Sequence, residues 1–241
     1  MQNQYDPRMT AQPGATVGVP HVARDAGLRS YMLSVYNYMA SGVLLTGIVA
    51  LVFYNSGLAE QVLQTPLRWL IVLAPLAFVM IMSFGANKMS TGTMQAMFWG
   101  FATVMGLSMS SIFIVYTGTS IAQTFFAVSA GFLGLSLYGY TTKKDLSGFG
   151  TFLIMGVVGL LVAMIANLFI QSTALGMAIS AIGVLLFAAL TAYDTQKIKN
   201  MYAYVAGTDM MGKTAIMGAL TLYLDFINMF TFLLSFMGDR R

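Results

Sequence analysis

Two aspartates inside apolar segments are the residues of this sequence best suited to chemistry. One is Asp225 in Leu222-Tyr223-Leu224-Asp225-Phe226-Ile227-Asn228, eleven residues into an apolar stretch that begins at Thr214. A charged aspartate at the centre of a membrane helix costs roughly 2.5–3.5 kcal/mol, so such residues usually have a function. Asn228 lies one helical turn later and is expected on the same face, within reach of a hydrogen bond to Asp225. The alternative role for Asp225 is a hydrogen bond that only packs helices together.

The second aspartate is Asp194, in Ala192-Tyr193-Asp194-Thr195-Gln196-Lys197. It could simply be solvated at a membrane interface or paired with Lys197. The apolar pattern continues to Val205, however, which would put Asp194 eleven residues from the inner end of its helix, a depth of ~16 Å. Asp225 lies equally far from Thr214 on the next helix. The sequence therefore predicts that the two carboxyl groups are level and face each other.

Two carboxyl groups in a low-dielectric site cannot both ionise at low cost, so a facing pair tends to share a proton. We expect such a pair to act as a pH-sensitive latch, with Thr191 and Tyr193 as supporting residues. Once deprotonated, it would form a weak cation site. Because calcium prefers six to eight oxygen ligands, the pair suits passing contact with a calcium ion better than tight storage. Apart from calcium as a permeant ion, no cofactor is expected.

The composition indicates that the protein lies in a lipid bilayer, and it excludes several kinds of catalytic and metal site. Of the 241 residues, 58% are hydrophobic and 8% are charged, against roughly a quarter charged in soluble domains, so the lipid bilayer must be the main partner. Cysteine is absent and the only histidine is His21 in a polar N-terminal segment, which excludes thiolate metal sites, a cysteine nucleophile and a Ser-His triad. The twelve basic residues separate apolar runs and predict topology, not a nucleic-acid surface.

The spacing of charges predicts an all-α integral membrane protein with seven transmembrane helices. Residues 1–29 are predicted to be a disordered cytoplasmic tail and residues 30–241 a seven-helix domain. Period-two alternation is absent, so a β-barrel is not expected. Each apolar run has about the 20 residues that cross a bilayer; the predicted spans are Tyr31–Tyr54, Trp69–Phe84, Met94–Tyr116, Ile121–Tyr140, Phe149–Ile170, a sixth from about Ala174, and Thr214–Gly238.

The charges also predict orientation in the cell membrane. A cytoplasmic N-terminus puts at least nine basic residues inside, as the positive-inside rule requires. The tail Arg240-Arg241 would lie outside if the last segment crosses fully and inside if it is re-entrant, and the charges leave that open. Two small-residue pairs, Ala130 with Gly134 and Gly159 with Ala163, are candidates for close helix packing.

The two aspartate segments also carry a family signature. Ala192-Tyr193-Asp194-Thr195-Gln196-Lys197-Ile198 and Leu222-Tyr223-Leu224-Asp225-Phe226-Ile227-Asn228 resemble the hallmark stretches of the Bax-inhibitor motif family, in a bacterial member, and Lys143-Lys144-Asp145-Leu146 matches as well.

The resemblance implies a seven-helix fold whose last helix is surrounded by the other six. It also implies that Asp194 and Asp225 are a pH-sensing acid pair governing a calcium leak. Some members pair the first acid with an arginine at the inner end of the second helix, where this chain has only Lys88.

Two other classes of function stay open. Presenilin-like intramembrane proteases also place a Tyr-Asp on one helix and an Asp on the next, but their second acid follows a Gly-x-Gly motif and here it follows Leu222-Tyr223-Leu224. The bulky Leu224 would hinder the approach of a peptide backbone, so an enzyme is not expected. The other class is a non-transporting regulator that binds other membrane proteins.

Overall fold

The computed structural model describes residues 21–241, with side chains from Asp25 onward. In this part of the chain, seven helical segments are long and apolar enough to cross a membrane, as the charge spacing predicted. They are formed by α1 (His21–Asn55), α3 (Leu67–Gly85), α4 (Thr91–Met109) continued by α5 (Ser111–Val115), α6 (Gly118–Thr141), α7 (Gly150–Ile170, entered through the short turn η1, Ser147–Phe149), α8 (Thr173–Val205) and α9 (Met210–Met237). The short helix α2 (Leu58–Leu63) was not predicted.

The first helix begins earlier than the sequence suggested. Residues 21–29 are helical, so the predicted tail is wrong there, and residues 1–20 lie outside the described part. The reason is visible in Leu28, which packs against the hydrophobic core and extends the buried face of α1 toward the N-terminus.

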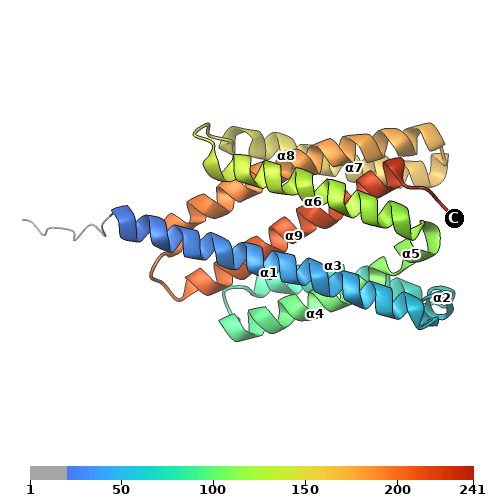
Figure 1. Ribbon diagram of the computed structural model, residues 1–241, viewed down its shortest axis with the longest axis horizontal. Helices are drawn as coiled ribbons and strands as arrows, with labels where there is room; N and C mark the ends of the chain where they lie inside the picture. The colour runs from blue at the N-terminus through green and yellow to red at the C-terminus, as the bar shows by residue number, and fades with distance from the viewer. Residues whose placement is uncertain (1–20) are drawn as a thin grey trace, which may run out of the picture.

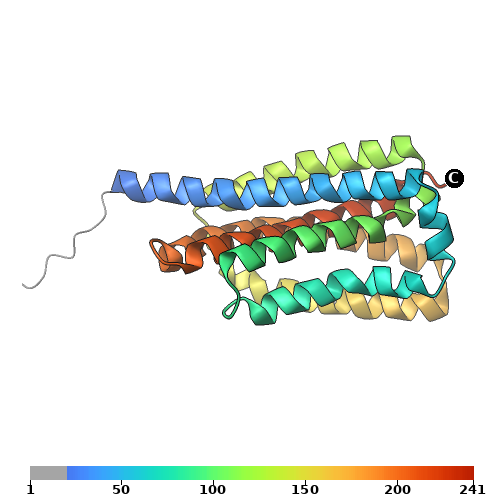
Figure 2. The ribbon, with the colours of Figure 1, turned by 90° about the horizontal axis from the view of Figure 1, so that it is seen from below.

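The C-terminal helix α9 is the central helix of the bundle (Figures 1 and 2). Within its most apolar window 61% of residues are buried, against 11% in the corresponding windows of α3 and α7. It packs against α1, α4, α6 and α8, while α3 packs on the outside of α4 and α7 on the outside of α8. The central position agrees with the prediction, but four helices surround α9 directly and the other two form an outer layer.

Helix α9 crosses the whole bundle. It begins beside the N-terminal end of α1 and ends at the opposite side (Figure 1). There Arg241 Nη1 donates a 2.6 Å hydrogen bond to Tyr54 Oη near the end of α1, and Thr117 N donates to Asp239 O at 3.1 Å. The last segment is therefore a full crossing and not a re-entrant one, which settles the question that the charges left open.

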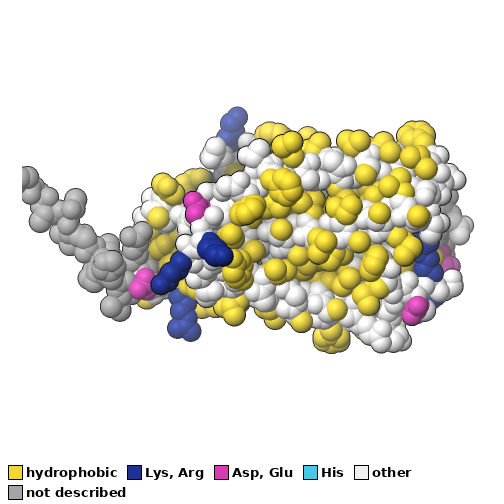
Figure 3. All heavy atoms as spheres, turned by 90° about the horizontal axis from the view of Figure 1, so that it is seen from above, with side chains coloured by type: hydrophobic (Ala, Val, Ile, Leu, Met, Phe, Trp, Pro, Cys, Tyr) yellow, Lys and Arg dark blue, Asp and Glu magenta, His cyan; other side chains and the backbone are white. Residues whose placement is uncertain are grey.

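Charged side chains gather at the two ends of an otherwise apolar surface (Figure 3). The end at which α1 begins, called the N-terminal end below, also holds the α3–α4 turn, the α6–α7 loop and the α8–α9 turn. Basic residues at this end outnumber those at the other; among the described residues they are Arg29, Lys88, Lys143, Lys144, Lys197, Lys199 and Lys213, against Arg68, Arg240 and Arg241.

Glycines bring helix backbones together at positions that the sequence did not indicate. A Cβ on Gly139 of α6 would lie only 2.2 Å from the carbonyl oxygen of Ala192 on α8, and a Cβ on Gly106 of α4 would lie 2.8 Å from the Thr46 carbonyl oxygen on α1. The predicted small-residue pairs were wrong, because a Cβ on Gly134 or Gly159 would meet nothing within 4 Å. Both glycines are exposed on the outside of the bundle.

Candidate acid-pair site between α8 and α9

An antiparallel contact between α8 and α9 fixes the position of both aspartates. At one end of the contact Gly218 lies against Ile198. At the other end the Phe232 ring covers Gly183 and stacks on Phe187, with ring centroids 5.8 Å apart. Asp225 stands seven residues from both Gly218 and Phe232, on the face of α9 that repeats every two turns. Asp194 likewise stands seven residues after Phe187, the stacking partner of Phe232, so the antiparallel register brings it opposite Asp225.

The two carboxyl groups meet in the interior. Asp194 is 8% exposed and Asp225 is 4% exposed, and the two carboxyl groups lie close enough to interact with each other. A hydrogen bond between two carboxyl groups requires a proton on one of them. The Asp225 Oδ2 atom is buried and has no hydrogen-bond partner. The predicted closeness of the two acids is thus present in the structure, while their role stays a prediction.

The residue after Asp194 connects α8 to two more helices. Thr195 is fully buried, and its Oγ1 lies 3.0 Å from Ser136 Oγ on α6. Ser136 Oγ in turn lies 2.6 Å from Tyr36 Oη on α1. This chain of three hydroxyl groups ties α1, α6 and α8 together at the level of the acid pair. Sequence reasoning missed it, because the partners are 59 and 100 residues apart and hydroxyl residues are common in membrane helices.

The next residue, Gln196, holds the loop between α6 and α7. Its Nε2 donates a 2.8 Å hydrogen bond to Lys144 O, and its Oε1 accepts a 2.8 Å hydrogen bond from Leu146 N. The three consecutive residues Asp194, Thr195 and Gln196 therefore reach α9, α6 and the loop respectively. The contacts of Gln196 with Lys144 and Leu146 join two of the stretches that resemble the family signature, 143–146 and 192–198. They give a structural reason for the two stretches to occur in the same protein.

The acid pair lies closer to the end of α6 than to the end of α8. Ser136, which bonds to Thr195, is five residues from the last residue of α6, or ~8 Å along the helix. The predicted depth of ~16 Å was counted from Val205, and α8 continues well beyond the end of α6 (Figure 1), where Tyr202 packs on Tyr31 near the start of α1. One to two helical turns therefore separate the pair from the α6–α7 loop.

The predicted supporting residues do not all join the pair. Asn228 Nδ2 donates to the backbone oxygen of Leu224 at 2.8 Å, so it does not satisfy Asp225. Thr191 Oγ1 likewise donates to Phe187 O. Tyr193 packs its hydroxyl end against Gly150 of α7.

Lys88 is exposed in the turn between α3 and α4. The cation that interacts electrostatically with Asp194 is instead Lys197, whose Nζ lies 6.0 Å from the Tyr193 ring centroid. Thr191, Tyr193, Asn228 and Lys88 thus surround or border the site without contacting the carboxyl groups in the way the sequence suggested.

A third acid near the site has different surroundings. Asp145 is exposed in the α6–α7 loop, and its Oδ1 accepts a 2.9 Å hydrogen bond from Ser147 N. Hydrogen bonds from Ser147 hold the pKa of the Asp145 carboxyl below its ordinary value. Asp145 is therefore ionised at any pH near neutral, and it provides a natural control for the buried pair.

The donor set at the pair is sparse for a bound metal. Within the described residues, no group of three or more His, Cys, Asp or Glu side chains could hold a metal ion. Asp194 and Asp225 would offer carboxylate oxygens from two residues, fewer than the six to eight oxygen ligands of calcium unless water supplies the rest. The two side chains alone therefore do not complete the ligand set of a calcium ion.

The fold and the site define a class of multi-pass α-helical membrane proteins built around a buried acid pair. Comparison with known proteins gives the family: residues 28–241 match the family model described as "Inhibitor of apoptosis-promoting Bax1". The chain belongs to this Bax inhibitor family.

Bacterial relatives are similar over almost their whole length. The inner membrane protein YbhL of Escherichia coli strain K12 is 47% identical over 220 residues, covering 90% of this chain and 94% of YbhL. An uncharacterized protein of Rickettsia prowazekii is 48% identical over 219 residues, covering 90% and 92%. The protein YrjE of Lactococcus lactis is 38% identical over 218 residues, covering 89% and 93%. The seven candidate spans and the relation to YbhL support a multi-pass inner membrane protein.

Proposed function

We propose that this protein is a pH-sensitive cation leak, with calcium as the expected ion, gated by Asp194 and Asp225. The observation that carries the proposal is the pair of buried carboxyl groups that lie close together across the α8–α9 contact. The hydroxyl chain and the Gln196 contacts surround this pair and link its position to α1, α6 and the α6–α7 loop. A change in the protonation or position of the pair would therefore alter the contacts of several helices and of the α6–α7 loop.

The gating energy comes from charge repulsion. While the pair holds one proton, a hydrogen bond between the two carboxyl groups keeps α8 and α9 together. When the last proton leaves, two negative charges ~4 Å apart repel by about 4 kcal/mol at an effective dielectric of about 20. That is enough to shift an equilibrium between two conformations that differ by a few kcal/mol. The separated carboxylates would then give a cation a polar path through the apolar bundle.

The described conformation corresponds to the closed state in this proposal. Both carboxyl groups are almost completely buried, and the neighbours of Asp225 on α9 are apolar or aromatic. Phe226 packs edge-to-face on Phe132 of α6 with centroids 5.6 Å apart. Conduction then requires that α9 and α6 move apart where Phe226 packs against Phe125 and Phe132.

We also propose that the pair has no enzymatic activity. An aspartyl protease must bring a peptide bond to both carboxyl groups at once. Here the two acids contact each other in a closed interior, and Leu224 fills the position before Asp225. Incubation of the purified protein with transmembrane peptide substrates should give no cleavage that depends on Asp225.

For orientation, we propose that the N-terminus is cytoplasmic. Because α9 crosses fully, nine basic residues of the sequence then lie inside and three outside, as the positive-inside rule favours. A tag before α1 should be labelled only after the inner membrane is permeabilised, and a tag after Arg241 should be labelled from the periplasmic side. The reverse labelling pattern would contradict this orientation.

The leak itself is tested by calcium flux through the purified protein in liposomes. Wild type should conduct with a marked dependence on pH over the range of about pH 5 to 8, in which ordinary Asp carboxyls do not titrate. Asp194→Asn and Asp225→Asn should each flatten this dependence, and the double variant should add little, because both residues act as one unit. Asp145→Asn is the matched control and should keep the wild-type profile. If wild type conducts no cation at any pH, or if both single variants keep its pH dependence, the proposed function is wrong.

A further inference from the structure

A long groove runs between α1 and α6, and the central helix α9 forms its floor. Figure 1 shows α9 passing behind the space between these two helices. Three adjoining hollows make up this α1–α6 groove, with volumes of about 360, 280 and 290 Å³ from the N-terminal end outward. The first two share Tyr36 and Leu133 in their walls, and the last two share Val43, Phe125 and Phe226.

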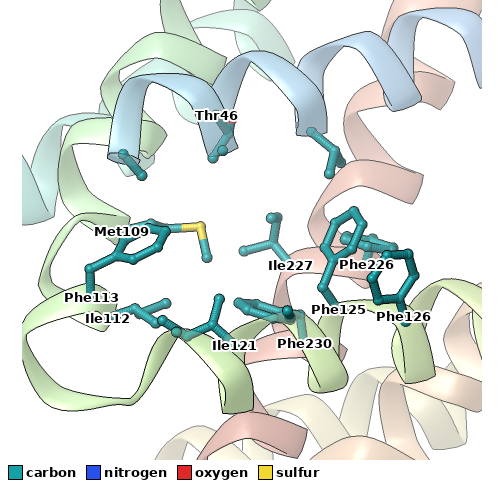
Figure 4. Close-up of a pocket in the computed structure, with 15 residues that line it drawn as sticks. Thr46, Met109, Ile112, Phe113, Ile121, Phe125, Phe126, Phe226, Ile227 and Phe230 are labelled. Atoms are coloured by element: carbon teal, nitrogen blue, oxygen red, sulfur yellow. The ribbon is translucent and has the colours of Figure 1, made fainter. Parts of the chain in front are cut away.

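The walls of the groove are almost entirely apolar. In the outermost hollow, shown in Figure 4, the rings of Phe125, Phe226 and Phe230 and the side chains of Met109 and Ile227 surround the space. Phe226, the residue after Asp225, lines the middle and outermost hollows. Tyr36 and Ser136 of the hydroxyl chain line the first hollow. The groove therefore borders the proposed ion site, but neither carboxyl group lines it.

The only charged side chain among the described residues that line these hollows lies at the N-terminal end. Arg29 borders the first hollow together with Tyr36 and Tyr140. A second cation, Lys199, donates a 2.7 Å hydrogen bond to Tyr140 O, and its Nζ lies 5.2 Å from the Tyr140 ring centroid. The one acid nearby is Asp25, which lies with Lys199 in a neighbouring hollow. Tyrosines and basic residues at this level are typical of the interface between lipid headgroups and hydrocarbon.

We propose that the α1–α6 groove binds an anionic phospholipid, with its phosphate at Arg29 and an acyl chain lying along the groove. The lengths agree for the first two hollows: half a hydrocarbon core is about 15 Å, and the fifteen residues of α1 from Arg29 to Val43, which border these two hollows, extend ~21 Å, headgroup region included. The outermost hollow lies beyond the reach of an acyl chain from this leaflet. The lipid would come from the leaflet at the N-terminal end. Its acyl chain would cover the part of α9 that the surrounding helices leave open.

The size of the groove argues against a protein occupant. A transmembrane helix about 11 Å in diameter and 30 Å long fills about 2,800 Å³. The three hollows are each roughly a tenth of that volume. A chain of methylene groups fits such a narrow space without moving α1 away from α6. A helix from a partner protein or from a second copy does not.

The test is binding of phosphatidylglycerol to the delipidated full-length protein in detergent, followed by native mass spectrometry, with phosphatidylcholine for comparison. Wild type should bind phosphatidylglycerol saturably and in preference to phosphatidylcholine. Ala40→Trp fills the middle hollow and should abolish binding. Its control is Leu44→Trp, one turn later on the same helix, at a side chain that is 65% exposed and outside the groove; it should bind as wild type does.

The headgroup contact is tested separately by Arg29→Gln. Since one basic residue near the membrane surface is worth about a factor of five in affinity for an anionic lipid, this variant should bind phosphatidylglycerol about fivefold more weakly and lose the preference over phosphatidylcholine. Lys88→Gln removes an exposed cation at the same end but away from the groove and should change neither. The proposal is overturned if Ala40→Trp binds as well as Leu44→Trp, or if Lys88→Gln weakens binding as much as Arg29→Gln.

A protein occupant would give a different result. Because the chain has no cysteine, a single Leu133→Cys reports on contacts within the groove. Disulfide-linked dimers of Leu133→Cys formed in liposomes would assign the groove to a second copy and overturn the lipid site. A monomer that stays accessible to a lipid-soluble thiol reagent, and is protected by phosphatidylglycerol, supports it.

Discussion

Replacement of Gly139 by alanine perturbs the acid pair without touching it, through the contact between α6 and α8. The new Cβ would lie 2.2 Å from Ala192 O, whereas an ordinary contact needs about 3.4 Å. The neighbour is backbone and cannot rotate away, so the helices must separate by about 1 Å. Overpacking of this kind costs roughly 1–3 kcal/mol. Separation also lengthens the Ser136–Thr195 hydrogen bond, worth about 1 kcal/mol, and alanine returns up to ~1 kcal/mol in helix propensity.

The expected net destabilisation by Gly139→Ala is about 2 kcal/mol, or roughly thirtyfold in the unfolding equilibrium. Reversible unfolding in mixed micelles with sodium dodecyl sulfate, followed by circular dichroism, measures it. The control is Gly134→Ala, five residues earlier on the same helix, where a Cβ meets nothing within 4 Å, so that variant should be as stable as wild type or slightly more stable. Equal stability of the two variants would refute the close approach of α6 and α8.

Two further predictions concern buried polar contacts away from the carboxyl groups. Thr46 Oγ1 lies 2.6 Å from Tyr223 Oη and donates to Ala102 O at 2.8 Å, so Thr46→Val and Tyr223→Phe should each destabilise the fold by about 1–2 kcal/mol. The double variant should cost less than the sum of the two, and full additivity in the same unfolding assay would show that the hydroxyl groups do not act together. Gln196→Ala removes both contacts to the α6–α7 loop and should speed amide hydrogen exchange at Leu146 while leaving exchange in the centre of α9 unchanged; unchanged exchange at Leu146 would contradict the contact.

The crossings could be predicted because charge is scarce in this chain and its positions are informative. Arg68 and Lys88 lie at the two ends of the α3 crossing, for example, and the charge-free run between Lys88 and Lys143 has room for two crossings. The acid pair could also be predicted, because counting residues from a helix end gives depth directly. The count did not give the distance from the pair to the α6–α7 loop, since α8 extends beyond the end of α6 and the sequence of α8 alone does not show where α6 ends.

The faces of the helices could not be predicted in the same way. Lipid and protein interior are equally apolar. The sequence pattern of a small-residue pair such as Ala130 with Gly134 is therefore the same whether the pair faces lipid or another helix. Gly139, which does make a close contact, belongs to no such pattern. Asn228 was expected to bond Asp225 because of its spacing, but its amide instead bonds the backbone of its own helix, a choice that any polar residue in a helix can make.

The central claim is that the titration of Asp194 and Asp225 controls the separation of α8 and α9. It is tested most directly by the distance between spin labels on Leu185→Cys of α8 and Phe236→Cys of α9, two exposed positions on the far side of the acid pair from the α8–α9 turn. Because the chain has no other cysteine, double electron–electron resonance in liposomes reads this one distance. With calcium chelated, raising the pH from about 5 to about 8, above the range in which ordinary Asp and Glu carboxyl groups titrate, should populate a longer distance in wild type. The same change in pH should leave the short distance in place when Asp225→Asn is added. A distance that does not depend on pH in wild type, or that lengthens equally in the Asp225→Asn protein, would contradict the account.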